Sequence, residues 1–374
     1  MKITIKCKLD PDKRQIKILD KTLSKCLEAL NYISKIAWNK HCFNRVALHH
    51  LVYYKTKLKF KLHAQLCTSL RDRIAFSYKA DKRKQHIFKN PFLPLNFPRT
   101  ISFIGFETVS ISTISGRQKI PLILSDYQKQ LFSKAIKFCE SELIKRNNKF
   151  FLNITIEIKD EPIKEMKDII GVDLGIKNLA TCSTGNNFTG KQVQSVRNRY
   201  QTLRSQLQSK GTRSAKRHLK KMSGREKRFQ KDVNHVISKR IVELANQHNS
   251  AIALEDLKDI RKTKRYGKKQ RTILHRWAFS QLRQFISYKA QRDGIPIIFV
   301  DPAYTSQTCS FCGNLGIRNA EHFSCSSCNF ENDVDYNASL NIRRAAFNKP
   351  IVTSDMTVKG ALKAQLRPSL VTIS

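Results

Sequence analysis

Two Cys-x-x-Cys pairs stand close together in the last quarter of the sequence, at Cys309, Cys312, Cys325 and Cys328. Each pair can place two thiolates at one tight turn, and four thiolates complete the tetrahedral shell that Zn²⁺ prefers. Gly313 and Asn329 directly follow the pairs and tolerate the backbone conformation that such turns require. A closed shell leaves no position for a reacting water. The sequence therefore predicts one structural Zn²⁺, with His322 in the intervening loop as a bystander.

Three acidic residues stand where apolar segments end or a helix begins. Asp173 closes the run in IIGVDLG, Glu255 closes the run in AIALEDL, and Asp335 opens the predicted helix in DVDYNASLNI. Taken singly, they have ordinary interpretations: a turn former, a surface acid at a strand end and a helix N-cap. Taken together, they are carboxylates in apolar surroundings, where desolvation is costly. Three carboxylates that meet at one sheet edge could hold two Mg²⁺ ions, with Mn²⁺ as the alternative, and hydrolyse a phosphodiester.

The charge of the chain points to a polyanionic partner. The sequence carries 70 Lys and Arg against 29 Asp and Glu, a net charge of +41. Such a surface repels itself unless a polyanion neutralises it, and nucleic acid is the natural choice. A ribosomal-type protein and a binder of anionic membranes are the alternatives. One run of bases is expected to contact an RNA or DNA backbone, rather than to form a merely solvated helix face: Arg213, Lys216, Arg217, Lys220, Lys221, Arg225, Lys227 and Arg228.

The sequence gives no sign of a membrane protein. No apolar run approaches the roughly 20 residues of a spanning helix. The opening MKITIKCKLD alternates like a strand and does not resemble a signal peptide. Six further cysteines are scattered singly among apolar residues, which fits a reducing compartment: Cys7, Cys26, Cys42, Cys67, Cys139 and Cys182. We therefore expect a soluble, intracellular protein.

The first half of the sequence predicts a β-rich module that helices interrupt. Residues 2–9 alternate as a strand. Helical spacing of apolar residues follows over 16–36, with Asp10 and Pro11 as the expected N-cap and first-turn proline. A second helical region is expected over 47–82.

The module is then expected to return to strands. Residues 90–98, NPFLPLNFP, predict a proline-punctuated linker. Strands are expected from about 101 to 158, and the last two form a hairpin that turns at Asn147 and Asn148.

From residue 168 short apolar strands alternate with helices, which predicts an α/β domain. The expected strands lie in 168–184, 250–257 and 295–300. The expected helices are a basic hairpin over 192–249 that breaks near Ser209-Lys210-Gly211, and single helices over 272–293 and about 334–347. The run RKTKRYGKKQR at 261–271 predicts a basic loop, either a lid near the acids or a plain connector. Trp277 has helical spacing and is expected in the core.

Four segments in this order, GVDLGIKNLAT, IALEDLKDI, DPAYTSQTCSFCG and DVDYNASLNI, resemble the TnpB family of transposon-encoded RNA-guided DNA endonucleases. Compact type V CRISPR effectors share the same core. The resemblance covers nearly the whole chain, since the opening strand and helix also look like the start of that family. The combination of separated acids and a cysteine ribbon makes the motif set specific.

The resemblance implies a multidomain α/β fold whose nuclease is a RuvC domain with an RNase H-like fold. The catalytic acids of the family fall on Asp173, Glu255 and Asp335, which would hold two Mg²⁺ ions in addition to the structural Zn²⁺. Asp256 and Asp333 lie next to or near these acids in the sequence but do not match the catalytic positions of the family's motifs.

The resemblance also implies a domain order. A β-barrel-like wedge domain would take residues 1–10 and 88–165, and a helical recognition domain over 11–87 would interrupt it. The nuclease domain would take 166–303 and 331–349. The inserted zinc ribbon, part of a target-strand-loading segment, would take 304–330, and the tail at 350–374 is expected to be irregular or disordered.

The implied activity is cleavage of double-stranded DNA next to a short flanking motif, by two-metal-ion hydrolysis. The implied partners are a guide RNA derived from the transposon end and the target DNA, in the cytoplasm of a prokaryote and near its nucleoid. Base pairing would read the target, and the protein would read the flanking motif. A monomer is the expected state.

One position departs from the pattern of the family. Many relatives carry an Arg in an R-x-F-x-C frame just before the second cysteine pair, whereas here the frame begins with Glu321 and ends with Cys325. Arg318, three residues earlier, is the expected substitute for a base that would face the scissile phosphate.

Four other functions stay open at this point. The chain could be an RNA-guided DNA-binding protein without cleavage, a minimal type V CRISPR effector, a transposase that joins strands, or a basic zinc-ribbon protein that binds RNA. The presence of all three acids argues against the first and the last. No separate recombinase motif supports the transposase.

Overall fold

The computed structural model describes residues 1–256 and 279–347. They form two compact units, residues 1–159 and the chain from residue 160 onward. The predicted basic loop at 261–271, Trp277, residues 272–278 of a predicted helix and the tail at 350–374 lie outside the described residues. Across the described ranges, every helix is too short or too polar to cross a membrane.

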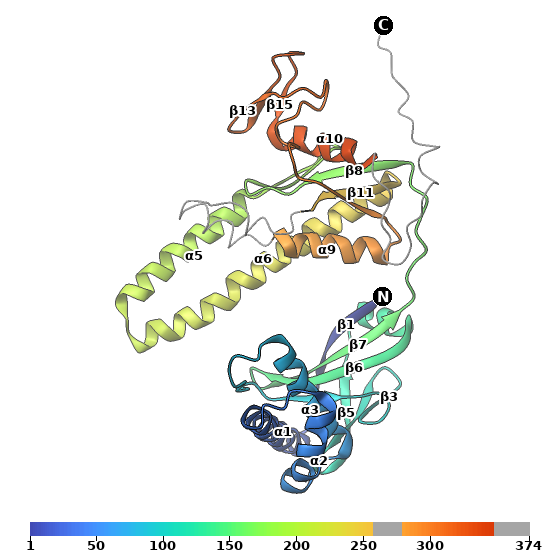
Figure 1. Cartoon of the computed structure of the whole chain (residues 1–374), viewed down its shortest axis with the longest axis vertical. Coiled ribbons are helices and arrows are strands. Elements are labelled where there is room, and N and C mark those ends of the chain that lie inside the picture. Colours follow the sequence, from blue (N-terminus) through green and yellow to red (C-terminus); the bar gives the residue numbers. More distant parts are fainter. Residues whose placement is uncertain (257–278, 348–374) are drawn as a thin grey trace. The chain divides into compact units, whose positions relative to one another are not determined.

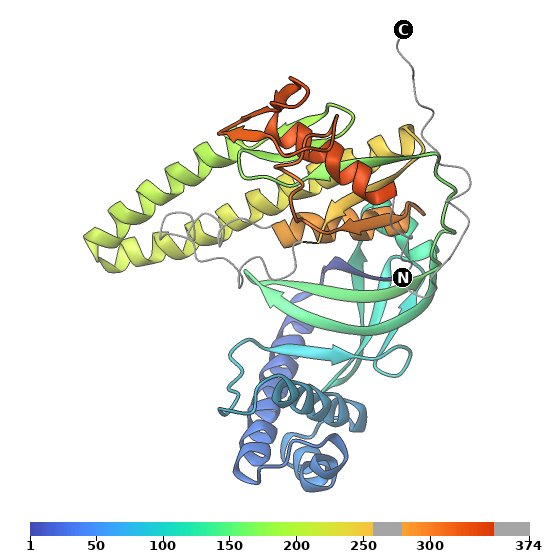
Figure 2. The same cartoon turned by 45° about the horizontal axis from the view of Figure 1, so that its top comes forward.

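The first unit is built on one antiparallel sheet of seven strands, in the order β2-β6-β7-β1-β5-β4-β3. The sheet curves strongly and comes close to a closed barrel (Figure 2). Its strands are β1 (Lys2–Leu9), β2 (Phe92–Leu95), β3 (Ile101–Ile104), β4 (Thr108–Thr113), β5 (Gly116–Ile123), β6 (Ala135–Arg146) and β7 (Lys149–Ile158). A short helix, α4 (Asp126–Ser133), precedes β6 and was not predicted.

The hairpin of β6 and β7 forms as the sequence predicted. Asn147 and Asn148 both have positive φ, 50° and 59°, which is the conformation of the tight turn that fits the twist of a hairpin. Alternate residues of β7 are buried, Leu152 and Ile154 among them. Because side chains of a strand alternate between its two faces, this pattern fixes which face of the hairpin packs on the core.

Three helices lie between β1 and β2: α1 (Lys13–Asn39), α2 (Arg45–Phe60) and α3 (Ala64–Ala80). The predicted N-cap of the first helix is wrong, because Asp12 caps α1 and shares a capping box with Gln15. The helical region expected over 47–82 is confirmed, but as two helices, α2 and α3. It breaks after α2, where Lys61 adopts a left-handed conformation with φ of 53°.

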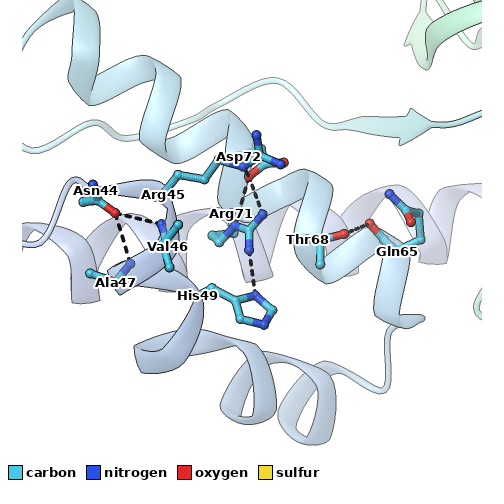
Figure 3. Close-up of polar contacts among 9 residues, drawn as sticks. All are labelled: Asn44, Arg45, Val46, Ala47, His49, Gln65, Thr68, Arg71 and Asp72. Carbon is cyan, nitrogen blue, oxygen red and sulfur yellow. Dashed lines mark hydrogen bonds and ion pairs between the residues drawn. The ribbon is translucent and has the colours of Figure 1, made fainter.

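A polar cluster around the buried Arg71 ties α2 to α3 (Figure 3). The Asn44 side chain caps α2 by accepting from the backbone N–H groups of residues 46 and 47. The guanidinium of Arg71, only 7% exposed, is held 2.6 Å from His49 Nδ1 and is paired with Asp72. Arg45 reaches Asp72 from the first turn of α2. The buried charge of Arg71 is therefore compensated on both sides.

The linker expected over 90–98 is wrong in part, because β2 lies inside it. Pro94 is a residue of this strand and pairs with Glu142 of β6. Since β2 is the edge strand of the sheet, the missing N–H of a proline is tolerated there.

The second unit contains a five-stranded sheet in the order β10-β9-β8-β11-β12. Its strands are β8 (Asp168–Asp173), β9 (Asn178–Cys182), β10 (Asn187–Thr189), β11 (Ser250–Glu255) and β12 (Ile297–Val300). β8, β9 and β10 pair antiparallel, whereas β8, β11 and β12 pair parallel. Residues 250–254 of β11 are all buried, as expected for a central parallel strand with both faces covered.

Helices cover the two faces of this sheet (Figure 1). Helix α10 (Val334–Phe347) packs on β8, whereas α6 (Arg213–Gln247) and α9 (Phe279–Arg292) pack on each other and on β11 and β12. α5 (Lys191–Lys210) and α6 form the predicted basic hairpin, which breaks at Gly211 with φ of 62°. The expected final helix, 334–347, has the observed bounds of α10.

A small third sheet carries the cysteine pairs. Its strands are β13 (Ile317–Asn319), β14 (His322–Ser324) and β15 (Glu331–Asp333), paired antiparallel in that order. β15 runs without a break into α10, so the sheet with the cysteines is covalently continuous with the helix that carries Asp335.

Candidate functional site

Asp173 and Glu255 stand at the carboxyl ends of two adjacent parallel strands. The register of β8 and β11 places Leu254 opposite Val172. The next residue of each strand is an acid, so the two carboxylates emerge side by side and on the same face. This is the arrangement that the sequence predicted from two apolar runs that each end in an acid.

Helix α10 brings the third acid to the same place, and Gly171 permits its close approach. A Cβ atom on Gly171 would lie 2.0 Å from the backbone oxygen of Ser339 and 2.6 Å from the backbone nitrogen of Arg343. Gly171 and Asp173 are two residues apart and therefore face the same side of β8. The helix thus lies on the face to which Asp173 points. Arg343 anchors its far end by donating to both oxygens of Asp168, at 2.8 and 2.9 Å.

Asp335 is not the N-cap of this helix. Asp333 takes that role, because its carboxylate accepts from the backbone N–H groups of Asp335 and Tyr336 at 2.9 and 3.0 Å. The side chain of Asp335 therefore does not cap the helix and makes other contacts. Its Oδ2 accepts from Asn178 Nδ2 at 2.9 Å and lies 3.6 Å from the position of a Cβ on Gly175, in the turn between β8 and β9.

The surroundings of all three carboxyl groups oppose their ionisation. Burial, followed by the charges of Glu255 and Asp335, raises the pKa of Asp173 to about 8. Burial is also the main cause that raises the pKa of Glu255 and that of Asp335. Acids that repel one another in a desolvated place are a familiar sign of a functional site. A bound dication would reverse this penalty.

Two basic side chains lie in this region: Arg318 in β13, the edge strand of the third sheet, and Lys177 in the turn between β8 and β9. The charge of Arg318 lowers the pKa of both Asp173 and Asp335, although the net pKa shift of each acid remains upward. Glu321 forms an ion pair with Lys177 and raises the pKa of Asp335. The cation that acts on the acids in this region is therefore Arg318, whereas Glu321 is occupied by a lysine.

Several residues that shape the site were missed in the sequence. Asn178 orients Asp335, Gly171 admits α10, and the Thr305 hydroxyl donates to Glu255 Oε1. Nothing in the local sequence marks Asn178 or Thr305, because each contacts an acid that lies 50 or more residues away. The glycine carried a usable signal, since a glycine inside an apolar strand often marks a close backbone approach.

The four paired cysteines converge on one point. Their sulfur atoms all lie within 4.8 Å of one another. In residues 1–256 and 279–347 they are the one group of at least three Cys, His, Asp or Glu side chains packed so closely, and the three acids are spaced more widely. Each pair forms the same turn: the residue after the pair donates its N–H to the carbonyl of the first cysteine. That residue is Gly313 or Asn329, with φ of 84° and 56°.

The donor set fits a structural Zn²⁺. Burial opposes ionisation of Cys325, but backbone N–H groups and neighbouring thiols together bring the pKa of its thiol to about 6. Burial and the other three thiols raise the pKa of Cys328 to about 12. Four thiols so close together ionise fully when a dication compensates their charge, and this set matches tetrahedral Zn²⁺. His322 lies beside Glu331, at 3.5 Å, and is not part of the group.

The predicted nucleic-acid contacts share one helix. All eight residues, from Arg213 to Arg228, are exposed on α6. One acid lies among them, Glu226, and it is paired with Arg204 of α5. The hairpin of α5 and α6 (Figure 1) therefore carries many exposed bases and is strongly cationic.

Comparisons with known proteins show the family of the chain. Residues 153–261 match the sequence model of a family described as probable transposase, and residues 279–342 match the Cas12f1-like TNB domain. A TnpB-like protein of Methanocaldococcus jannaschii is 31% identical over 262 residues, which cover 63% of this chain and 91% of that protein. The chain belongs to the TnpB family.

Larger relatives share the same core. The CRISPR-associated endodeoxyribonuclease Cas12f1 of Sulfoacidibacillus thermotolerans is 31% identical over 232 residues, 56% of this chain. The chain spans about half of that protein, 53% of its length. Among solved structures, a Cas12f1–sgRNA–target DNA complex matches 89% of this chain and 83% of its own protein chain, with a TM-score of 0.63 at 18% identity. That likeness supports the mixed α/β fold.

Proposed function

We propose that this chain is an RNA-guided endonuclease that cuts double-stranded DNA beside a short flanking motif. The observation that carries the proposal is the meeting of Asp173, Glu255 and Asp335. They come from β8, β11 and α10, and burial raises the pKa of each. Membership of the TnpB family supplies the expected reaction, and the name of the Cas12f1 relative, an endodeoxyribonuclease, points the same way.

The three carboxylates would hold two Mg²⁺ ions, or Mn²⁺ in their place. Oxygen donors of this kind suit hard dications, which supply an activated water and stabilise the leaving oxygen of a phosphodiester. The protein contributes the placement of the donors. Asn178 orients Asp335, Thr305 orients Glu255, and Arg318 adds a positive charge that can face a phosphate.

In the strand order β10-β9-β8-β11-β12, the first three strands pair antiparallel, and β8 then pairs parallel with β11, as β11 does with β12. This order supports the assignment of an RNase H-like RuvC nuclease to 166–303 and 331–349. The curved sheet and the helices of the first unit support a wedge domain interrupted by a recognition domain. The third sheet would be the zinc ribbon of the target-strand-loading segment. The continuity of β15 with α10 supports a role in leading a strand to Asp335.

The partners that fit these surfaces are a guide RNA and target DNA. A net charge of +41 needs a polyanion, and the exposed row of bases on α6 offers phosphate contacts within the second unit. Sequencing of the RNA that co-purifies with the chain tests this part. The expected result is one discrete RNA with a structured scaffold and a variable end; a broad mixture of cellular RNA would argue against a guide.

The nuclease assignment is tested with single substitutions of the three acids. Asp173→Ala, Glu255→Ala and Asp335→Ala should each abolish Mg²⁺-dependent cleavage while guide-dependent DNA binding survives. Asp256→Asn is the matched control, because Asp256 is the neighbour of Glu255 but pairs with Arg283 at 2.9 Å. An acid whose alanine variant still cuts DNA in Mg²⁺ is not a member of the site.

A guided binding protein that cuts weakly or not at all is the second candidate. Glu321 favours it, because a carboxylate stands beside Asp335 where many relatives carry an arginine. The same cleavage assay decides between them. A chain that binds guided DNA but leaves it intact in Mg²⁺ and in Mn²⁺ would be this second kind of protein.

A further inference from the structure

We infer that Thr305 and Asn341 are positioning residues, which hold the Glu255 carboxylate in a fixed place relative to the helix of Asp335. This inference rests on the proposed nuclease function. It concerns residues that touch neither substrate nor metal and that act through Glu255.

Thr305 is the direct partner of Glu255. It lies 50 residues further along the chain, just after β12, and its hydroxyl donates to Glu255 Oε1. Thr305 is 8% exposed, so its hydroxyl has little competition from water. A glutamate side chain turns about several bonds, and a buried donor on one oxygen selects one of its orientations.

Asn341 fixes Thr305 from the opposite side. Its side-chain amide donates to the backbone oxygen of Thr305 at 2.9 Å and to that of Thr308 at 2.6 Å. Asn341 is 7% exposed, and an unpaired buried amide is costly, about 1–3 kcal/mol. The segment therefore has one favoured position against α10. The position of Thr305 is set by a helix residue that lies six places after Asp335.

Asn337 secures the same segment one turn earlier. It is fully buried; its amide donates to the backbone oxygen of Thr308 at 2.8 Å, and its Oδ1 accepts from the Ser310 N–H at 2.9 Å. Residues 305–310 are thus fastened to α10 at several points. A continuous series of contacts runs from Glu255 on β11 through Thr305 and Asn341 to α10, which carries Asp335.

The Thr305 hydroxyl is thus a hydrogen-bond partner that stands behind a proposed metal ligand, Glu255. The partners behind metal ligands commonly change metal affinity or activity by about 10- to 100-fold when removed.

The test compares Thr305→Val, which keeps the shape and loses the donor, with Thr305→Ser, which keeps the donor. Guide-dependent DNA cleavage by the full complex is measured in single turnover across a Mg²⁺ titration, together with the melting temperature and zinc content. Thr305→Val should need roughly 10-fold more Mg²⁺ for half-maximal cleavage, with zinc content unchanged. Thr305→Ser should stay within about twofold of wild type. Thr308→Val makes the same side-chain change nearby and should keep the wild-type Mg²⁺ requirement.

Asn341→Ala tests the second member of the series. It should also raise the Mg²⁺ requirement. Combined with Thr305→Val, it should need no more Mg²⁺ than the worse of the two single variants, because both act through one contact. Fully additive effects of the pair would overturn the coupling. A Thr305→Val variant with the wild-type Mg²⁺ requirement, or one in which valine and serine behave alike, would overturn the positioning role.

The outcome can be separated from failure of the proposed function. If the wild-type complex does not cut DNA, the nuclease proposal fails. The positioning role is then read from Mn²⁺ binding to the guide-bound protein, followed by electron paramagnetic resonance. Thr305→Val should weaken Mn²⁺ binding roughly 10-fold and Thr305→Ser should not. Equal binding by wild type and Thr305→Val would refute the inference in this case also.

Discussion

The close packing of α10 on β8 can be tested by the substitution Gly171→Ala, which adds one methyl group to the strand. In Gly171→Ala the new Cβ would lie 2.0 Å from the backbone oxygen of Ser339 and 2.6 Å from the backbone nitrogen of Arg343. Both atoms belong to the helix backbone, so no side chain can turn away to relieve the contact. Either α10 moves off the strand or β8 bends.

The required movement follows from the distances. Ordinary contact begins at 3.4 Å, so the backbone oxygen of Ser339 must retreat by about 1.4 Å. Overpacking of a buried contact costs about 1–3 kcal/mol. A displacement of that size also moves Asp335 relative to Asp173. Misplacement of reacting groups by 1 Å can cost on the order of 100-fold in rate. We expect Gly171→Ala to lower the free energy of unfolding by about 1–3 kcal/mol. The single-turnover cleavage rate should fall by at least about tenfold.

The assay is denaturant unfolding of the zinc-loaded protein, together with single-turnover cleavage by the guide complex. Gly224→Ala is the matched control. It lies within α6, where the nearest atom to a new Cβ is the end of the flexible Arg228 side chain, at 3.0 Å. Alanine also favours a helix over glycine by about 1 kcal/mol. A Gly171→Ala protein as stable and as active as Gly224→Ala would show that the helix is not held against β8 in this way.

Four further predictions follow from the charges and the cysteines. The pKa of Asp173, about 8 in the folded state, is above its unfolded value, so the folded state loses stability as pH rises from about 4 to 8. Asp173→Asn should therefore melt at a higher temperature than wild type at pH 8 without Mg²⁺, and its free energy of unfolding should exceed that of wild type by at most roughly 5 kcal/mol. The difference in stability between Asp173→Asn and wild type should become smaller toward pH 5, and Mg²⁺ should stabilise only wild type. A difference that does not change with pH would contradict this. Cys312→Ser should lower zinc content and melting temperature together, and unchanged zinc stoichiometry would exclude the four-thiolate site. Glu321→Arg should raise the cutting rate, with Glu321→Gln in between, whereas a slower arginine variant would place Glu321 away from phosphate. Burial, followed by the charge of Arg71, lowers the pKa of His49 below 6.5, so stability should fall as pH drops below that value. His49→Gln should flatten this pH dependence of the melting temperature.

The elements that the sequence predicted well are those whose information is local. Asn147 and Asn148 between two alternating runs are sufficient to specify the β6–β7 hairpin. The run DVDYNASLNI predicts α10 in its observed place, because an acidic residue is favoured at a helix N-terminus. The errors arose where tertiary structure decides. β2 was missed because Pro94 argues against a strand, unless that strand lies at the edge of a sheet. The sequence does not show which strand is at the edge.

The three acids of the candidate site could be singled out in the sequence, whereas the residues that hold them in place could not. Asp173 and Glu255 end apolar strands, and a carboxylate in that position is conspicuous because desolvation makes it costly. The contacts of Thr305 with Glu255 and of Asn178 with Asp335 join segments 50 and 157 residues apart. No local pattern encodes such a contact. The capping ambiguity of Asp335 could likewise be resolved only when Asp333 was seen to take that role.

The positions of the three acids in the sequence also determine at which stage of synthesis the site can form. Asp173, Glu255 and Asp335 are separated by 82 and 80 residues, and a ribosome needs on the order of 4–16 seconds to synthesise each interval. Until residues 334–347 emerge, one face of β8 has no helix to cover it and the third carboxylate does not exist. A nascent chain that already displays Asp173 and Glu255 therefore lacks a complete site. Synthesis from the N-terminus thus delays completion of the proposed site until α10 has been made.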